Sequence, residues 1–329
     1  MGKRIAVLCS GGDSQGMNSC IKAIVDTCVA HDVEIFGVNR GYQGLIENDF
    51  VKLTKQDVLN IETLAGSVIK TSRCPEFKTH EGVLKGKKVL DKNKIDGLIV
   101  LGGDGSFRGC AELVEEGACV IGIPGTIDND LFYTEKTLGF DTAVKNAVKA
   151  VDDIKQTMIA NDRTLVVKCM GRGCGDIALY TAVAVEADSL AVVELNTTIA
   201  DIISDVKKAI ENGVKAPVVI MSESCPFDLD EVVYQLRNEL HLSVRGTELG
   251  YIQRGGAPSV LDRINSVKWG VTAVELLLEG KTNFALGVKN DKVTATPLLD
   301  AVKVKQKFRF DMVEKLKGIN NIEWEEGDK

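Results

Sequence analysis

The sequence predicts an α/β fold in which parallel sheets are covered by helices. Short apolar runs alternate with amphipathic runs along the chain, and glycine-marked turns separate them. One run, "IDGLIVLGG" at 95–103, is apolar almost throughout, as expected of a strand buried on both faces. The chain has 329 residues, a length that suits about two domains or one large α/β unit.

The expected strands are short apolar runs bounded by glycine or polar residues. They cover residues 4–10, 34–39, 95–103, 119–125, 164–171, 189–195 and 216–223. The expected helices lie between and after these runs. They cover residues 17–30, 106–117, 140–160, 175–187, 199–212, 228–240 and 261–279. This alternation is what parallel sheets with covering helices require.

Composition and charge exclude several classes of protein. Hydrophobic residues make up 44% of the chain, charged residues 26%, and the net charge is −7. Without a basic surplus, nucleic acid is not expected as the main partner, although a few local arginines suffice for a small anionic ligand. The longest apolar runs are too short to span a bilayer, and the N-terminus lacks a signal-peptide layout. We therefore expect a cytoplasmic protein with no membrane partner.

Cysteine and histidine usage argues against a zinc site. Nine cysteines occur without C-x-x-C spacing, and the three histidines are scattered. Most of these thiols are expected to be small core residues in a reducing compartment. Cys74 is singled out because it follows Arg73.

Two segments repeat one pattern of strand, Gly-Gly-Asp and helix. They are "AVLCSGGDS" and "LIVLGGDGS". Glycines let backbone N–H groups approach a phosphate, and a helix N-terminus adds partial positive charge. An aspartate there, Asp104, suggests Mg²⁺ between protein and polyphosphate. A tight turn with a capping side chain is the alternative for one loop, but two such loops favour a phosphate site. Neither a P-loop nor a G-x-G-x-x-G motif is present.

Other candidate residues are paired acids and loop arginines. "IPGTIDND" places Asp128 and Asp130 just after an apolar run, either as a solvated turn or as a site that takes a proton from a substrate hydroxyl. Arginines near expected strand ends can clamp phosphates, although each alone could be a surface residue or a structural ion pair. They are Arg73, Arg163, Arg172, Arg245 and Arg254.

Several segments together carry a resemblance to a known family. They are "SGGDSQGMN" (10–18), "GYQGL" (41–45), "TSRCPEF" (71–77), "GGDGS" (102–106), "PGTIDND" (124–130), "MGRGCGD" (170–176), "SE" (222–223) and "IQRGG" (252–256). In this order and spacing the chain resembles the ATP-dependent 6-phosphofructokinases of the bacterial short-chain type, over essentially its whole length. A single motif is weak, because Gly-Gly-Asp-Gly also occurs in NAD and lipid kinases, but the set is specific.

The resemblance implies transfer of the γ-phosphate of ATP to the 1-hydroxyl of fructose 6-phosphate, a step of glycolysis. Asp128 would be the base, Thr126 and Arg172 would steady the phosphoryl group, and Asp130 would support the loop electrostatically. Asp104 would hold Mg²⁺. The implied ATP-binding residues are Gly12, Arg73, Cys74, Gly103, Asp104, Gly105 and Ser106.

The sugar phosphate would be bound mainly by residues later in the chain. Met170 and Gly171 would line its pocket, and Glu223 would accept a hydrogen bond from a sugar hydroxyl. The full implied set is Thr126, Asp128, Arg163, Met170, Gly171, Arg172, Glu223, Arg245, Tyr251 and Arg254. Arg254 would bind the 6-phosphate, and Arg163 and Arg245 would reach it from a neighbouring subunit.

The resemblance also implies an architecture. Two three-layer α/β/α Rossmann-like domains with mostly parallel sheets would hold the active site in the cleft between them. The larger, ATP-binding domain would take residues 1–138 and 252–305, and the smaller, fructose 6-phosphate-binding domain 139–251 and 306–329. The chain would cross between them more than once and form a homotetramer with shared active sites.

Two departures from the family pattern bear on substrates and regulation. Tyr251 replaces a histidine that helps to bind the 6-phosphate, so it can donate a hydrogen bond but brings no charge. At positions matching the arginine-lined effector site the chain has Lys22, Asp26, Lys55 and Lys155. We expect weak or altered activation by ADP, with a solvated helix face as the alternative explanation of these residues.

Three alternatives to an active ATP-dependent enzyme stay open. A pyrophosphate-dependent or other sugar-phosphate kinase would share the fold, but pyrophosphate users tend to carry larger residues at Gly105 and Gly125. An NAD-kinase-like protein would not need the "PGTIDND" segment. A catalytically weakened regulatory paralogue would bind sugar phosphate without turnover, and the intact candidate residues argue against it.

Overall fold

The computed structural model describes residues 2–304 and 308–320. The chain divides into two compact units, Met1–Thr142 with Gly256–Gln306, and Ala143–Gly255 with Lys307–Lys329. Their boundaries differ by a few residues from those expected from the sequence, and the chain crosses between the units three times. Residues 306–307 and 321–329 of the expected C-terminal segment lie outside the described residues. No helix in the described ranges is long and apolar enough to cross a membrane.

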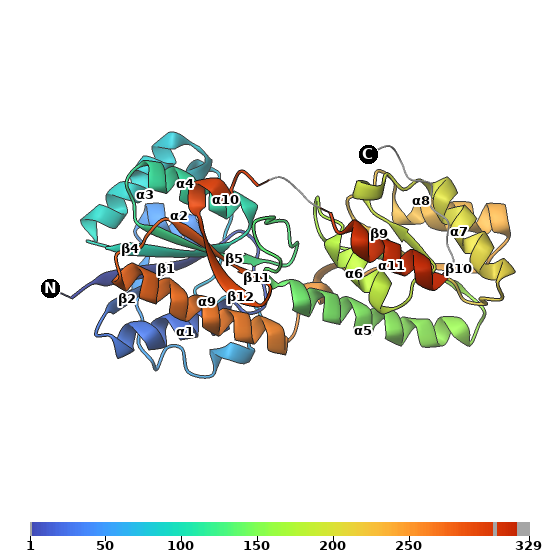
Figure 1. Ribbon diagram of the computed structural model, residues 1–329, viewed down its shortest axis with the longest axis horizontal. Coiled ribbons are helices and arrows are strands. Elements are labelled where there is room, and N and C mark those ends of the chain that lie inside the picture. The colour runs from blue at the N-terminus through green and yellow to red at the C-terminus, as the bar shows by residue number, and fades with distance from the viewer. Residues whose placement is uncertain (1, 305–307, 321–329) are drawn as a thin grey trace. The chain divides into compact units, whose positions relative to one another are not determined.

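The first unit is built on a mostly parallel sheet (Figure 1). Its strands are β1 (Arg4–Ser10), β2 (Glu34–Val38), β3 (Phe50–Lys52), β4 (Gly97–Gly102), β5 (Val120–Thr126), β6 (Leu138–Gly139), β11 (Phe284–Lys289) and β12 (Lys292–Pro297). They follow the order β12-β11-β5-β4-β1-β2-β3, and β6 pairs with β5. Only the two outermost pairs, β2 with β3 and β11 with β12, are antiparallel among the described strands.

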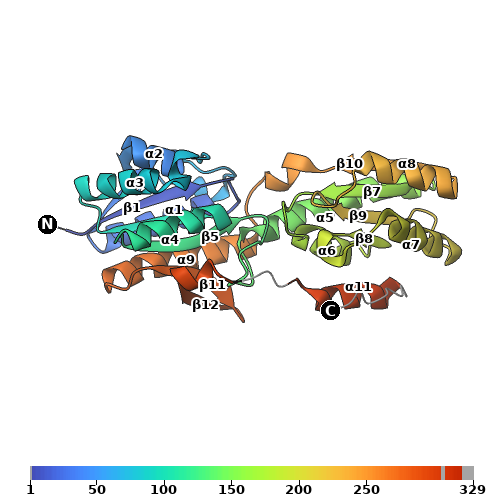
Figure 2. The ribbon, with the colours of Figure 1, turned by 90° about the horizontal axis from the view of Figure 1, so that it is seen from above.

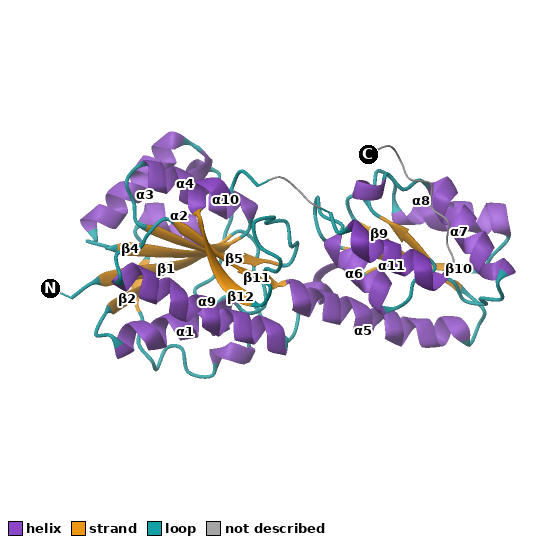
Figure 3. Ribbon diagram, viewed as in Figure 1, coloured by secondary structure: helices purple, strands orange, loops and turns teal. Residues whose placement is uncertain are grey.

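Helices cover both faces of this sheet, as Figure 3 shows. One face carries α1 (Met17–Ala30) and α9 (Val260–Leu278), which pack on each other and on the sheet around the buried Trp269. The other face carries α2 (Gly41–Glu47), α3 (His80–Lys92), α4 (Asp104–Glu115) and α10 (Leu298–Ala301). Buried side chains on both faces explain why the central strands are apolar throughout.

The order of the strands creates a topological switch point in the first unit. β1 lies between β2 and β4, so the chain leaves β1 first to one side and later returns on the other. In open parallel sheets, ligands bind outside the carboxyl ends of strands at this kind of switch point. The two Gly-Gly-Asp loops follow β1 and β4, the strands on either side of it.

The second unit has a parallel sheet of four strands (Figure 2). They are β7 (Thr164–Cys169), β8 (Ser189–Ala191), β9 (Val218–Ser222) and β10 (Val244–Glu248), in the order β10-β7-β9-β8. α7 (Ile199–Glu211) and α8 (Leu229–Leu240) share an apolar core with one face. α6 (Asp176–Ala184) contacts β9 and is joined by α11 (Phe310–Asn320). α5 (Phe140–Ile159) contains the first crossing between the units.

The expected strands and helices are confirmed, with one correction. The run 189–195 was expected to be one strand, but β8 ends at Ala191 and a short 3-10 helix covers Val193–Leu195. The sequence reading missed elements with weak apolar patterns, among them α3, β10 and the β11–β12 hairpin. β10 is an edge strand with mostly exposed side chains, so an apolar run was never required there.

Candidate functional site

The candidate nucleotide residues of the first unit gather at the carboxyl edge of its sheet. β1 runs into Gly11 and Gly12, and the adjacent β4 runs into Gly103 and Asp104. Gly11 has a left-handed backbone with φ 88°. The Ser106 hydroxyl, in the first turn of α4, donates to the carbonyl oxygen of Ser10 over 3.1 Å. This hydrogen bond ties the two Gly-Gly-Asp loops together.

Asp104 is the candidate Mg²⁺ ligand. It begins α4, and its partly exposed carboxylate pairs with Arg108 one turn later, over 3.0 Å. No cluster of three potential acidic, histidine or cysteine ligands occurs within residues 2–304 and 308–320. Mg²⁺ commonly takes one or two protein carboxylates and completes its shell with water and substrate phosphates. A carboxylate beside a Gly-Gly-Asp loop is therefore compatible with Mg²⁺ that arrives with a nucleotide.

The segment carrying Arg73 and Cys74 is tied to the same edge. The Ser72 hydroxyl donates to the carbonyl oxygen of Arg40 over 2.7 Å, at the end of β2. Cys74 is half-buried, and burial raises the pKa of its thiol, so the thiol stays protonated at neutral pH. Its neighbour Arg73 therefore does not make it a reactive thiolate.

Tyr42 is a residue of this region that the sequence reading did not single out. Its ring stacks on Phe77 with centroids 3.9 Å apart, and its hydroxyl donates to the carbonyl oxygen of Ser106 over 2.7 Å. Burial raises its pKa well above the usual value. Tyr42 thereby joins the segment after Cys74 to the helix that follows the second loop. The motif "GYQGL" was the only signal for it.

The loop after β5 carries the candidate base. Thr126 ends the strand, and the backbone amide of Asp128 donates to its Oγ1 atom over 3.2 Å. The Thr137 hydroxyl donates to the carbonyl oxygen of Thr126 over 2.6 Å. Asp128 is only 5% exposed, so the alternative of a solvated turn does not describe it. Asp130 follows in the same loop and is partly exposed.

In the second unit, Glu223 organises a loop at the carboxyl edge of the sheet. Its Oε1 atom accepts hydrogen bonds from the backbone amides of Gly171, over 3.0 Å, and Arg172, over 2.7 Å. Both residues have positive φ, 141° and 57°, so this carboxylate stabilises a turn that ordinary residues avoid. Glu223 follows β9 and the loop follows β7, its neighbour in the sheet.

A second backbone contact brings the segment 249–254 to this loop. The amide of Met170 donates to the side-chain oxygen of Gln253 over 3.2 Å, and Leu249 donates to the carbonyl oxygen of Lys168 over 3.1 Å. The short 3-10 helix Gly250–Arg254 carries Tyr251, which is 83% exposed, and Arg254. Gln253 was not predicted from the sequence, because no local pattern marks a buried glutamine that links two loops by a hydrogen bond.

Arg163 and Arg245 lie at the opposite edge. Arg163 immediately precedes β7, and Arg245 pairs with Leu165 at the amino end of β10. Met170, Glu223 and Arg254 follow the carboxyl ends of the strands. A six-residue strand such as β7 spans about 20 Å. The unit therefore brings the two arginines together but separates them from the Glu223 loop.

The four positions that the family resemblance matches to an effector site lie in both units. Lys22 and Asp26 form an ion pair of 2.7 Å along α1, and Lys55 is exposed in the loop after β3. Lys155, on α5, donates to the carbonyl oxygen of Val185 over 3.2 Å. Two of these four charged side chains, Lys22 and Asp26, are thus already paired with each other.

Comparison with known proteins points to one family. The sequence profile described as phosphofructokinase matches residues 4–277. The ATP-dependent 6-phosphofructokinase of Clostridioides difficile (strain 630) is 41% identical over 96% of this chain and 98% of its own length. The enzyme of that name from Bacillus subtilis (strain 168) is 42% identical over 94% of this chain and 97% of its own.

Solved structures show the same likeness. The T-state structure of Pichia pastoris phosphofructokinase is 30% identical, with a TM-score of 0.88. It matches 97% of this chain, which spans 39% of that longer chain. A pyrophosphate-dependent phosphofructokinase from Nitrosospira multiformis has a TM-score of 0.86 over 93% of this chain and 86% of its own. Because its identity is 17%, it shows the fold alone.

Proposed function

The chain belongs to the phosphofructokinase family, and from this premise we propose that it phosphorylates fructose 6-phosphate with ATP. The γ-phosphate moves to the 1-hydroxyl of the sugar, which gives fructose 1,6-bisphosphate and ADP in glycolysis. The observation that carries the mechanism is the buried Asp128 beside Thr126, at the same sheet edge as the two Gly-Gly-Asp loops. We assign ATP to the first unit and the sugar phosphate mainly to the second.

The first unit supplies the phosphate-binding groups. Backbone N–H groups of Gly12, Gly103 and Gly105 would face the phosphates, and Arg73 would neutralise their charge. The Ser106 amide is not among them, because it donates to the carbonyl oxygen of Gly103 over 2.9 Å. Cys74 lies beside Arg73 against the nucleotide. Asp104 would hold Mg²⁺, which supplies charge neutralisation on the phosphate oxygens when it is bound.

The reaction is an in-line phosphoryl transfer. Asp128 accepts the proton of the sugar 1-hydroxyl as that oxygen bonds to the γ-phosphorus. The bond from the γ-phosphorus to the β–γ bridging oxygen breaks, and its electron pair leaves with ADP. Thr126 and Arg172 donate to the oxygens of the moving phosphoryl group, and Asp130 supports the loop electrostatically. Positioning and charge neutralisation supply most of the catalysis in such a step.

The second unit holds the sugar phosphate. Met170 and Gly171 line the pocket, and Tyr251 and Arg254 bind the 6-phosphate. In the described part of the chain, Oε1 of Glu223 takes the two backbone hydrogen bonds, which leaves its Oε2 atom for a sugar hydroxyl. Tyr251 can serve by hydrogen bonding, because its side chain is almost fully exposed.

ATP is favoured over pyrophosphate as the phosphoryl donor. A β-carbon placed at Gly105 would have no atom within 4 Å, so this glycine keeps space open beside the loop. A β-carbon at Gly125 would lie 3.1 Å from the Met17 methyl group and 3.3 Å from the Gly102 amide. The relatives at about 40% identity are named ATP-dependent, whereas the pyrophosphate-dependent neighbour is distant.

Shared active sites explain the position of Arg163 and Arg245. These arginines lie about one strand length from the Glu223 loop of their own chain, so we assign them to the 6-phosphate bound by a neighbouring subunit. This assignment requires an oligomer, and we propose a homotetramer in the cytoplasm. The ion pair between Lys22 and Asp26 supports weak activation by ADP, because the pair offers little net charge to a phosphate.

The test is ADP release from MgATP and fructose 6-phosphate, with a parallel pyrophosphate assay and an Asp128→Ala control. ATP-dependent turnover that disappears in the control supports both the donor and the base. Turnover with pyrophosphate alone would favour the related donor class. A folded protein that binds ATP without turnover would instead support a regulatory paralogue, and Tyr251→His would be the first reversion.

A further inference from the structure

Arg40 occupies an unusual backbone conformation between β2 and α2. Its φ and ψ are 58° and 28°, in the left-handed region, and Gly41 after it has φ 61°. For residues other than glycine this region is unfavourable, because the β-carbon comes too close to the following carbonyl oxygen. Neighbouring contacts must therefore hold Arg40 in place.

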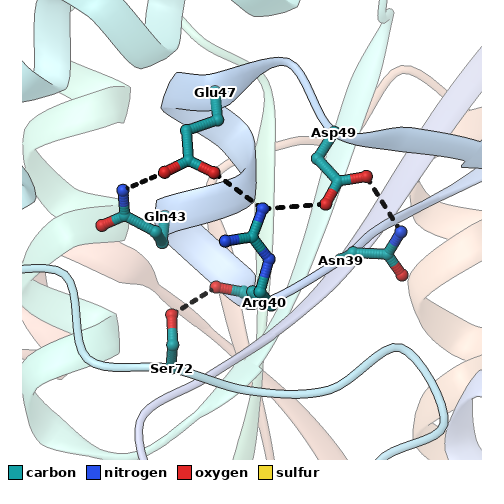
Figure 4. Close-up of polar contacts among 6 residues, drawn as sticks. All are labelled: Asn39, Arg40, Gln43, Glu47, Asp49 and Ser72. Carbon is teal, nitrogen blue, oxygen red and sulfur yellow. Dashed lines mark hydrogen bonds and ion pairs between the residues drawn. The ribbon is translucent and has the colours of Figure 1, made fainter.

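Two carboxylates hold the Arg40 side chain, as Figure 4 shows. Its guanidinium donates to Glu47 over 2.7 Å and to Asp49 over 3.0 Å. Each carboxylate has a second donor on its other oxygen, Gln43 for Glu47 and Asn39 for Asp49. An exposed ion pair contributes little alone, but here both acceptors are fixed from two sides, so the guanidinium has a defined position.

These contacts also keep the acidic groups charged. Hydrogen bonds from Gln43 and Arg40 lower the pKa of Glu47. Those from Asn39 and Arg40 lower the pKa of Asp49. Both carboxylates are therefore ionised at neutral pH, where they can pair with the guanidinium.

The backbone of Arg40 contacts the segment that leads to Arg73. Its amide donates to the carbonyl oxygen of Ile69 over 2.9 Å. Its own carbonyl oxygen accepts from the Ser72 hydroxyl over 2.7 Å, a contact drawn in Figure 4. Residues 69 and 72 are thus both attached to one residue, and Arg73 is the next in the chain. Displacement of Arg40 would move the start of the Arg73 segment with it.

Gly41 connects the same turn to the first phosphate loop. A β-carbon at Gly41 would collide with the carbonyl oxygen of Cys9, near the end of β1. The chain reaches Gly11 and Gly12 directly after β1. The dipeptide Arg40–Gly41 therefore contacts residues that lead directly into both segments to which ATP phosphates are assigned, Cys9 before Gly11–Gly12 and Ser72 before Arg73.

We propose that Arg40 is a positioning residue for the phosphoryl donor. Its side chain, anchored by Glu47 and Asp49, holds a left-handed turn whose backbone sets Arg73 relative to the Gly11–Gly12 loop. Arg40 itself does not contact the reacting atoms. The inference rests on the proposed function, because it takes Arg73 as a ligand of the ATP phosphates.

The test compares Michaelis constants for the two substrates in three variants. Arg40→Asn removes the guanidinium but keeps a residue that tolerates the left-handed region. Ser72→Ala removes the link from the Arg73 segment without changing either ion pair. We expect each to raise KM for ATP by about two- to tenfold, the loss of one hydrogen bond, and to leave KM for fructose 6-phosphate within about twofold. Arg40→Lys should rescue much of the effect, because the single Nη2 atom makes both hydrogen bonds and a lysine ammonium can also donate to two carboxylates.

A matched control separates positioning from simple loss of charge. Lys52 pairs with Glu34 across the antiparallel strands β2 and β3, in the same unit and also at the surface. Lys52→Ala should leave both Michaelis constants unchanged. The double variant Arg40→Asn with Ser72→Ala should raise KM for ATP by less than the product of the single effects, since both act through one contact chain.

Other outcomes would overturn the inference, and Arg73→Ala tells which premise has failed. If Arg73→Ala weakens binding of a non-hydrolysable ATP analogue but Arg40→Asn and Ser72→Ala do not, the positioning role is wrong and the proposed site stands. If Arg73→Ala has no effect on that binding, the assignment of Arg73 fails and the inference fails with it. Equal changes in both Michaelis constants, together with a lower Tm, would assign Arg40 to general stability.

Discussion

The backbone amide of Asp128 donates a hydrogen bond to Oγ1 of Thr126, and both residues are buried at the end of β5. Because this hydroxyl already accepts a hydrogen bond, its own proton is directed to a different acceptor. A phosphoryl oxygen is the acceptor that the proposed mechanism supplies. The relationship therefore gives Thr126 two roles, one in fixing the Asp128 loop and one in donating to the moving group.

Substitution of Thr126 separates the hydroxyl from the shape of the side chain. Thr126→Val is nearly isosteric but lacks the donor, so we expect kcat to fall about 10²-fold or more. Thr126→Ser keeps the hydroxyl and should stay within about tenfold of the parent, because one flexible χ1 angle is the main change. Steady-state kinetics of both variants decide the point, and a valine variant with full kcat would remove Thr126 from the mechanism.

Loss of Arg108 should lower the requirement for free Mg²⁺. Arg108 would compete with the proposed Mg²⁺ for the Asp104 carboxylate, but the Arg108–Asp104 pair is partly exposed and thus weak. We expect Arg108→Gln to reduce the half-saturating free Mg²⁺ by about two- to fivefold. Lys149→Gln, which breaks an equally spaced pair with Asp153 on α5, is the control and should leave the half-saturating free Mg²⁺ unchanged. A higher requirement in Arg108→Gln would show that Arg108 assists binding of the ion.

Gly105→Asp should weaken ATP binding without harming the fold. The position has open space, and an aspartate in the first turn of α4 favours the helix by about 0.3–1 kcal/mol. Its charge would repel the phosphates assigned to this loop, so we expect KM for ATP to rise about tenfold or more while Tm is unchanged or higher. Gly105→Ala adds bulk without charge and should have the smaller effect. Equal effects of both would assign the loss to bulk alone.

Asp205 should make stability depend on pH in the acidic range. Burial raises its pKa from 3.8 to about 6 in the folded protein, although the Ser189 hydroxyl donates to it over 2.8 Å. The folded state therefore binds a proton more tightly than the unfolded state. This contribution to stability is complete below pH 3.8 and is lost as the pH rises through 6.

The variant Asp205→Asn should flatten this dependence. Between about pH 4 and pH 6, we expect the unfolding free energy of the parent to fall relative to that of the variant as the pH rises. Urea unfolding across this range measures it, with Asp152→Asn on the exposed side of α5 as the control. A difference that does not vary with pH would contradict the raised pKa. Asp262, whose pKa burial also raises to about 6, keeps some slope in both proteins.

Local sequence determined the central strands, their covering helices and the two Gly-Gly-Asp loops. β4 is buried on both faces and must be apolar throughout, and its glycine-rich end must approach a helix closely, so both leave patterns that a short window reveals. The segment "PGTIDND" likewise marked Asp128 before its burial was known. Family resemblance then supplied roles that no spacing could provide.

Tertiary structure alone decided which of these residues meet. Glu223 holds the backbone of Arg172, and Ser72 contacts Arg40, across separations that no periodicity records. The edge strands β10 and β12 were also not predicted from the sequence, because an exposed strand needs no apolar run. Sequence patterns also did not reveal that Arg163 and Arg254 lie toward opposite ends of the strands of one sheet. Local patterns report burial and backbone geometry, whereas contacts between distant segments depend on how the strands are ordered in the sheet.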